Sequence, residues 1–195
     1  MKNKQYIIFD LDGTLIDSYA TVVNVCKHVF AKQAPNAMPE DEFFRPYRFL
    51  DMEQMFQKLA EMANISKEEF RKEYDEQYSL DYISGSIVIN KQLEILKDAK
   101  TEGIGIIVLT NKKQELAEKV CKKMFGDKMV DIVIGRKGTL PIKPHHEIID
   151  RLQEYEITPV QCSKYYGDSI SDMNTAKMLS VDFVNVNSKV FSLLY

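Results

Sequence analysis

The chain has 195 residues, of which 45% are hydrophobic and 28% are charged, and its formal net charge is −3. This balance is typical of a globular protein that is long enough to form one core without disulfide or zinc cross-links. Acidic and basic residues are interspersed and form no basic stripe, so we expect no nucleic-acid partner.

The three cysteines, Cys26, Cys121 and Cys162, are scattered and form no C-x-x-C pair. An odd, scattered set indicates reduced thiols in the cytoplasm rather than a disulfide framework or a zinc site. The apolar run near the N-terminus is too short for a signal peptide, and no stretch approaches transmembrane length. We therefore expect a cytoplasmic protein with no membrane partner, present as a monomer or a dimer.

Five short apolar runs predict the strands of a parallel sheet. They are residues 5–9, 104–110, 130–134, 164–167 and 182–186. Amphipathic helical patterns lie between them, at residues 91–102, 112–124 and 147–155, and Ser171 is expected to cap a final helix. Lys112 and Lys113 would then lie on the solvated face of a helix. Apolar strands that alternate with helices indicate βαβ units and an α/β fold with a Rossmann-like, doubly wound parallel sheet.

Residues 17–84 interrupt this alternation and contain no convincing strand. Two helices are expected around residues 22–30 and 52–59, and a third begins at an S-x-x-E capping box formed by Ser66 and Glu69. We therefore predict an all-helical domain at residues 17–84, inserted after the first strand. Residues 1–16 and 85–195 would form the α/β core.

Charged and polar residues follow the predicted strands, at the edge where parallel α/β sheets bind ligands. They are Asp10, Asp12, Thr110, Asn111, Lys143, Asp168, Ser169 and Asp172. The carboxylates of Asp10, Asp12 and Asp168 would repel one another unless cations lay between them. Mg²⁺ prefers carboxylate and carbonyl oxygens and keeps positions for water and phosphate, so we expect Mg²⁺ and Lys143 in this cluster.

The spacing of Asp10 and Asp12 indicates a specific chemistry. Two carboxylates two residues apart, on a turn that leaves a strand, can flank one phosphorus atom. One can attack as a nucleophile while the other delivers and removes protons. Gly13 would let the backbone turn sharply, and nearby amides can donate hydrogen bonds to phosphoryl oxygens.

The chain resembles the haloacid dehalogenase superfamily of aspartate-nucleophile phosphotransferases. Four motifs in the family's order carry the resemblance, which covers essentially the whole chain. They are DLDGTL at residues 10–15, LTN at 109–111, KP at 143–144, and GDS at 167–169 followed by Asp172. The helical insert resembles the small cap of the phosphoglycolate-phosphatase-like and β-phosphoglucomutase-like branch.

The resemblance implies a Mg²⁺-dependent phosphatase that hydrolyses a small phosphorylated metabolite. Asp10 would attack phosphorus and form an aspartyl phosphate. Asp12 would protonate the leaving oxygen and then activate water. Thr110 and Asn111 would hold the phosphoryl oxygens, and Lys143 would neutralise charge on Asp10 and on the phosphoryl group.

The resemblance also implies a metal site. Asp168 would bind Mg²⁺ together with Asp10 and the main-chain carbonyl of Asp12. Four further residues would support the site: Gly13, Thr14, Ser169 and Asp172. In the helical insert, Arg45 and Arg48 are candidate substrate contacts, with an ordinary surface role as the alternative.

Two alternative functions stay open. A sugar-phosphate mutase shares the fold and the cap, although Gly13-Thr14 favours a phosphatase. A non-catalytic module that binds a phosphorylated metabolite is the other, but every expected catalytic position is intact. Asp12 argues against carbon–halogen hydrolysis, because dehalogenases replace the second aspartate. Residues 46–62 lack the glycine that the family often carries there, so phosphoglycolate specificity is not carried over.

Overall fold

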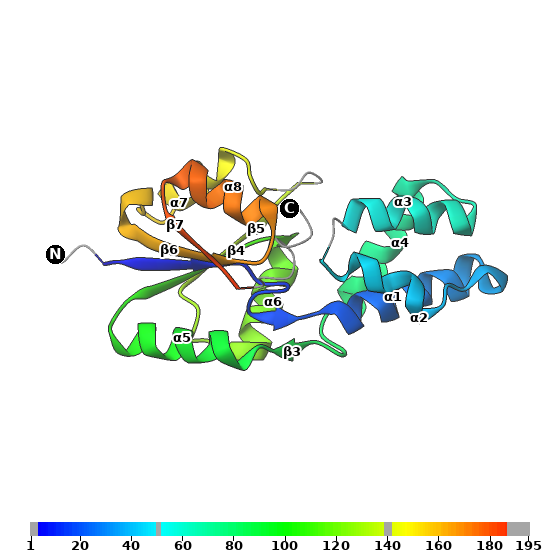
Figure 1. Ribbon diagram of the computed structural model, residues 1–195, viewed down its shortest axis with the longest axis horizontal. Helices are drawn as coiled ribbons and strands as arrows, with labels where there is room; N and C mark the ends of the chain where they lie inside the picture. The colour runs from blue at the N-terminus through cyan, green and yellow to red at the C-terminus, as the bar shows by residue number, and fades with distance from the viewer. Residues whose placement is uncertain (1–3, 50–51, 139–141, 187–195) are drawn as a thin grey trace. The chain divides into compact units, whose positions relative to one another are not determined.

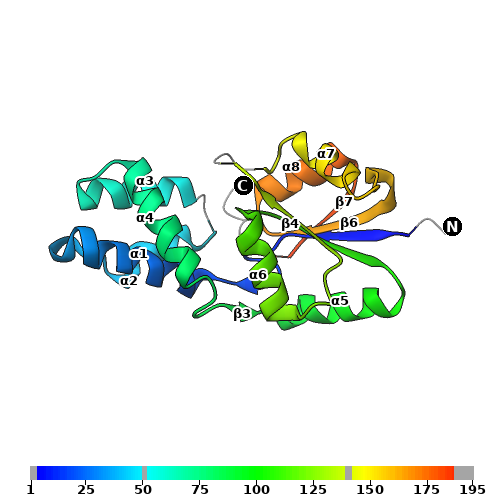
Figure 2. The ribbon, with the colours of Figure 1, turned by 180° about the vertical axis from the view of Figure 1, so that it is seen from behind.

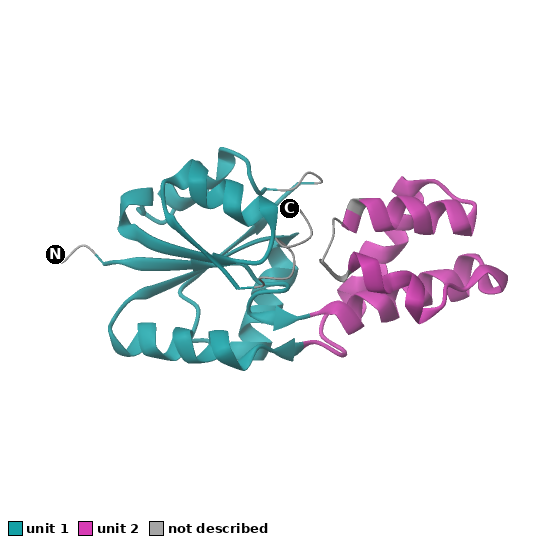
Figure 3. Cartoon of the chain, in the orientation of Figure 1, with its two compact units in different colours: residues 1–17, 87–195 teal, residues 18–86 magenta. Residues whose placement is uncertain are grey.

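The structure is a computed structural model that describes residues 4–49, 52–138 and 142–186. The chain divides into two compact units (Figure 3). Unit 1 comprises residues 1–17 and 87–195, and unit 2 comprises residues 18–86.

Unit 1 is built on a five-stranded parallel sheet with the strand order β5-β4-β1-β6-β7. The strands are β1 (Tyr6–Phe9), β4 (Gly105–Lys113), β5 (Ile132–Arg136), β6 (Cys162–Gly167) and β7 (Asp182–Asn185). Strand β1 lies in the middle, where Ile8 pairs with Ile107 on one side and Tyr165 on the other. The predicted α/β fold with a Rossmann-like parallel sheet is therefore confirmed.

Helices cover both faces of this sheet (Figures 1 and 2). Helices α5 (Asn90–Thr101) and α6 (Gln114–Phe125) cover one face, and α7 (Glu147–Gln153) and α8 (Ile170–Leu179) cover the other. On the second face, Ile148 of α7 and Leu179 of α8 belong to one buried cluster with Ile8 of β1. Burial on both sides explains why the central strands are apolar throughout rather than alternating.

Two predicted boundaries in unit 1 are wrong. Strand β4 extends to Lys113, which pairs with Arg136 after an irregularity in the ladder, so Lys112 lies on a strand and not on a helix. Helix α8 is capped by Ser169 and not by Ser171. The Oγ of Ser169 accepts the N–H of Asp172, whose carboxylate accepts the N–H of Ser169, and this reciprocal pair fixes the start of the helix.

Unit 2 is helical among its described residues. It contains α1 (Tyr19–Gln33), α2 (Asp41–Phe44), α3 (Met52–Ala63) and α4 (Lys67–Leu80), with the 3-10 turns η1 (Pro35–Ala37) and η2 (Arg45–Phe49). The three predicted helices correspond to α1, α3 and α4. The Oγ of Ser66 accepts the N–H of Glu69 at the start of α4, as the capping motif predicts. Phe70 packs against Phe30 and Phe56 with 5.9 Å between ring centroids in both pairs, which joins α4 to α1 and α3.

Short elements complete the structure. Strands β2 (Ile16–Asp17) and β3 (Ile87–Val88) pair antiparallel where the chain leaves and re-enters unit 1. A third 3-10 turn, η3 (Pro159–Gln161), precedes β6. No helix among the described residues combines the length and the apolar character needed to cross a membrane.

Candidate active site

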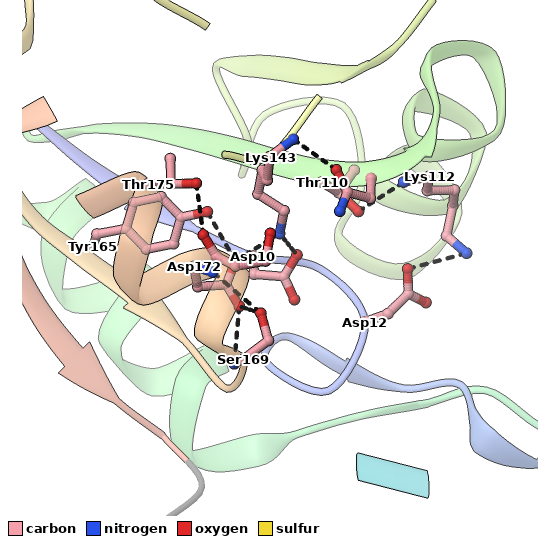
Figure 4. Close-up of polar contacts among 11 residues, drawn as sticks. Asp10, Asp12, Thr110, Lys112, Lys143, Tyr165, Ser169, Asp172 and Thr175 are labelled. Carbon is pink, nitrogen blue, oxygen red and sulfur yellow. Dashed lines mark hydrogen bonds and ion pairs between the residues drawn. The ribbon is translucent and has the colours of Figure 1, made fainter. Parts of the chain in front are cut away.

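Asp10, Thr110 and Asp172 gather around Lys143 near the carboxyl ends of β1, β4 and β6 (Figure 4). Asp10 directly follows β1, and its N–H donates to the carbonyl of Tyr166 on β6 at 2.9 Å. Because strands β4 and β6 flank β1, residues that end these three strands meet at one edge of the sheet. Asp10 is almost completely buried there, with 5% of its surface exposed.

The loop after β1 turns at Gly13, whose φ of +86° is in the region that favours glycine. A Cβ atom at this position would lie 2.2 Å from Oδ2 of Asp168. The missing side chain therefore allows the Asp168 carboxylate to lie against the loop that carries Asp10 and Asp12.

Lys143 is buried between two carboxylates. Its Nζ donates to Oδ1 of Asp10 at 2.5 Å and to Oδ1 of Asp172 at 2.6 Å, and only 4% of its side chain is exposed. Burial alone would lower the pKa of Lys143, but the carboxylate of Asp10 in particular outweighs burial and holds this pKa above its usual value. Lys143 is therefore a fixed positive charge beside Asp10.

Asp172 uses both carboxylate oxygens within this network. Oδ1 accepts from Lys143 and, at 3.0 Å, from the hydroxyl of Tyr165, while Oδ2 accepts the N–H and the hydroxyl of Ser169. Burial favours the neutral acid, but Lys143 and these hydrogen bonds outweigh burial and lower the pKa of Asp172. Asp172 is an ionised anchor for Lys143.

Sequence reasoning missed Tyr165. The position reads as an ordinary buried residue of a central strand, and the side chain is completely buried. The one signal in the sequence was a tyrosine three residues before Asp168. A buried tyrosine hydroxyl usually has a hydrogen-bond partner, so a bond to a site residue could have been expected.

The cluster fits a hard divalent cation. Asp10, Asp168 and Asp172 can each place a carboxylate oxygen within 4.8 Å of those of the other two. Since the oxygens of Asp172 are already hydrogen-bonded, Asp10 and Asp168 are the carboxylates with most need of a cation. Burial, with added repulsion from Asp172 and Asp12, raises the pKa of Asp168 to about 7. Burial also raises the pKa of Asp10, with Asp172 and Asp168 adding to the shift and Lys143 opposing it. Carboxylate oxygens without enough positive charge nearby are a donor set that suits Mg²⁺.

Asp12 lies apart from the Lys143 network. Its Oδ2 is 3.1 Å from Nζ of Lys112, and 32% of its side chain is exposed against 10% for Lys112. Both charges also act on Cys121 of α6, whose pKa is raised to about 12, mainly by burial and further by Asp12, with Lys112 opposing. Lys112 is thus a second site residue that sequence reasoning missed, although it directly follows Thr110-Asn111 at the same strand end.

Thr110 and Asn111 connect parts of the site. Oγ1 of Thr110 accepts the N–H of Lys112 at 3.2 Å, and Oδ1 of Asn111 accepts the N–H of Lys143 at 2.8 Å. Strand β4 therefore positions both lysines. Thr14 is also buried in unit 1, and its Oγ1 has no hydrogen-bond partner among the described residues.

The two candidate arginines of unit 2, Arg45 and Arg48, are not placed in a site by the described residues. Arg45 is 74% exposed at its side chain and forms an ion pair with Glu42 at 3.1 Å. The side chain of Arg48 lies outside the described part of the chain.

Comparisons with known proteins identify the family of the chain. The family model described as "Haloacid dehalogenase-like hydrolase" matches residues 7–186. The protein named "Putative pyrophosphatase PpaX" from Caldanaerobacter subterraneus is 28% identical over 185 residues, which cover 94% of this chain and 82% of that protein. A phosphoglycolate phosphatase from Aquifex aeolicus is 24% identical over 195 residues and covers 94% of this chain and 88% of its own length.

A solved structure shows the same fold. The haloacid dehalogenase-like family hydrolase SP0104 from Streptococcus pneumoniae superposes with a TM-score of 0.75 at 21% identity. The match covers 95% of this chain and 85% of that one. Taken with the family match over most of the sequence, these likenesses show that the chain is an enzyme that belongs to the haloacid dehalogenase-like hydrolases, of the phosphatase type.

Proposed function

We propose that this phosphatase hydrolyses a small phosphate monoester with the help of Mg²⁺, through an aspartyl phosphate on Asp10. The observation that carries the proposal is the buried Lys143, which bridges Asp10 and Asp172 at the carboxyl edge of the sheet. A fixed cation beside a buried carboxylate favours the ionised, nucleophilic form of Asp10 and can neutralise an incoming phosphoryl group.

In the first step, a carboxylate oxygen of Asp10 attacks phosphorus and the bond to the leaving oxygen breaks. Asp12, two residues further along the same turn, gives a proton to that oxygen. Thr110, whose Oγ1 accepts the N–H of Lys112, keeps its hydroxyl proton for a phosphoryl oxygen. Asn111 helps indirectly, because it holds the backbone of Lys143.

In the second step, water attacks the same phosphorus atom and gives a proton to Asp12. The bond between phosphorus and Asp10 breaks, which restores the Asp10 carboxylate and releases inorganic phosphate. Asp10 and Asp168 would hold Mg²⁺ with the carbonyl of Asp12, supported by Asp172, and the ion would supply positive charge for the phosphoryl oxygens.

The likeness to named phosphatases supports hydrolysis over mutase chemistry and over a non-catalytic binding role. The names of the two relatives make pyrophosphate and phosphoglycolate the first compounds to test. We assign unit 2 to the selection of substrate, as a cap domain with Arg45 and Arg48 as candidate contacts.

The test measures inorganic phosphate released from pyrophosphate, phosphoglycolate and a panel of sugar phosphates, with Mg²⁺ and with a chelator. The native chain is compared with Asp10→Asn and with the control Asp150→Asn, an exposed aspartate of α7. We expect turnover that needs Mg²⁺ and Asp10 but not Asp150. Turnover that survives Asp10→Asn would contradict the aspartyl phosphate, and full activity in the chelator would contradict the metal role.

A further inference from the structure

We infer that Lys112 is a positioning residue for the proton-transferring carboxyl group of Asp12. The inference rests on the proposed function, because it assigns a further residue to the same reaction. It starts from the 3.1 Å ion pair between Nζ of Lys112 and Oδ2 of Asp12 (Figure 4).

The backbone of Lys112 is held firmly enough for this task. Its N–H donates to Oγ1 of Thr110, and the next residue, Lys113, pairs with Arg136 of β5. On the other side, its carbonyl lies so near Gly135 that a Cβ atom there would be 2.7 Å from the oxygen. Two neighbouring segments therefore fix the backbone of Lys112, and only 10% of its side chain is exposed.

Asp12 is suited to such a partner because its carboxyl group must keep one orientation while part of it meets solvent. It lies on a turn after β1, and its side chain is partly open to solvent. The carboxylate of Asp168 repels that of Asp12. Lys143 is bonded to Asp10 and Asp172. A partly exposed ion pair adds little stability, so the contribution of Lys112 is orientation rather than binding energy.

The positioning serves both proton transfers. Asp12 must face the leaving oxygen when the bond from phosphorus to that oxygen breaks, and its proton moves to this oxygen. In hydrolysis of the aspartyl phosphate it must face the attacking water, whose proton returns to Asp12. Lys112 holds one oxygen of the carboxyl group and so restricts its rotation in both steps.

The test uses two aryl phosphates that differ in their need for a proton. Phenolate is a strong base and leaves well only when protonated, whereas p-nitrophenolate is weakly basic and leaves without help. The kcat/KM of each compound reports the chemistry up to departure of the aryl group. Lys112→Met is compared with the native chain and with Lys119→Met, which removes the same charge from an exposed position on α6.

We expect Lys112→Met to lower kcat/KM for phenyl phosphate by about tenfold, since general acid catalysis contributes roughly 10²–10⁴-fold and only its alignment is lost. The loss for p-nitrophenyl phosphate should stay within about twofold, by the same reasoning. Lys112→Arg should recover most of the phenyl phosphate rate. Gly135→Ala, which displaces the carbonyl of Lys112, should reproduce the selective loss.

Other results would overturn either the Lys112 inference or the proposed function. Equal losses for both compounds, or a rise in KM for both, would overturn the inference and indicate a direct contact between Lys112 and substrate. A selective loss in Lys119→Met would show that net charge is the cause. If the native chain hydrolyses neither compound, the proposed function fails, whereas native turnover with an unaffected Lys112→Met overturns the Lys112 inference alone. Thermal unfolding of each variant separates misfolding from these effects.

Discussion

The two lysines at the carboxyl edge of the sheet, Lys143 and Lys112, lie in contrasting environments. Lys143 is buried between two carboxylates, one of which has hydrogen bonds on both oxygens. Lys112 is paired with Asp12, a partly exposed carboxylate on a turn. The difference teaches that one site can contain a buried, rigid part, which fixes charge, and a more exposed part, where we propose that Lys112 orients Asp12 for proton transfer.

The largest expected effect comes from removing the rigid charge. Lys143→Met leaves two buried carboxylates without their shared cation, so we expect activity to fall at least about 10³-fold and unfolding free energy by about 3–5 kcal/mol. Phosphate release and urea unfolding measure the two losses. Lys137→Met, at a lysine that is 56% exposed and pairs with Glu154, is the control. A Lys143→Met protein of native stability would show that burial of the pair is not what holds this edge together.

The next effect tests the close approach of the loop after β1 to Asp168. Gly13→Ala places a Cβ atom on the Asp168 carboxylate and strains a residue with positive φ. We expect a loss of about 1–3 kcal/mol in stability and a weaker response to Mg²⁺, seen as a higher Mg²⁺ concentration for half-maximal activity. Gly126→Ala is a matched control, because its φ is +77° and no atom lies within 4 Å of the added Cβ. If both variants respond to Mg²⁺ alike, backbone strain rather than Asp168 explains the change.

A smaller effect is expected from Tyr165→Phe, which removes one of the hydrogen bonds to Asp172 and leaves the ring packed. Stability should fall by about 1–2 kcal/mol, because the lost bond ends on a charged group. Activity should fall only several-fold, since Ser169 and Lys143 still hold Asp172. Urea unfolding and initial rates check both. A collapse of activity as severe as that of Lys143→Met would mean that Tyr165 takes part in the chemistry itself.

The smallest effect concerns a carboxylate–lysine cluster at the opposite, amino edge of the sheet. Asp131 lies just before β5, bonds Lys100 and Lys4, and accepts the N–H of Ile106. Burial opposes ionisation, but the hydrogen bonds from Lys100 and Ile106 outweigh it and lower the pKa of Asp131. Asp131→Asn should therefore destabilise the protein at neutral pH without a change in kcat.

The pH dependence of this loss follows from the sign of the shift. A carboxyl group with a lowered native pKa stabilises the fold above its ordinary pKa of about 3.9, and this stabilisation disappears as pH falls through the lower native value. The difference in unfolding free energy between wild type and Asp131→Asn should therefore vanish in acid. If this difference stays constant as pH falls, the loss of stability comes from the altered hydrogen bond to Ile106 and not from the charge of Asp131.

Most of the α/β core was predictable because the central strands β1 and β4 are continuous apolar runs that lead into recognisable polar residues. Since parallel strands share one carboxyl edge, the assembly of Asp10, Thr110 and Asp168 followed from topology alone. The three long helices of unit 2 were predictable for a similar reason, because their apolar residues repeat with helical spacing.

The missed features depend on contacts between distant segments. The sequence predicts a helix at Lys112, because nothing local shows that β4 continues, through an irregular ladder, to the pairing of Lys113 with Arg136. Ser171 lies at a plausible cap position, but the reciprocal bonds of Ser169 with Asp172 decide the boundary. The role of Tyr165 depends on α8 packing over β6, which a single strand's sequence does not reveal.

The antiparallel pair of β2 and β3 has a consequence for how this chain could change. Asp17 pairs with Ile87, so the two ends of the helical segment are neighbours fixed in one register. A segment whose ends already meet can be shortened, lengthened or exchanged for another without pulling apart the five-stranded sheet. The junction would allow recombination to graft a new helical insert onto a sheet whose carboxyl edge stays the same.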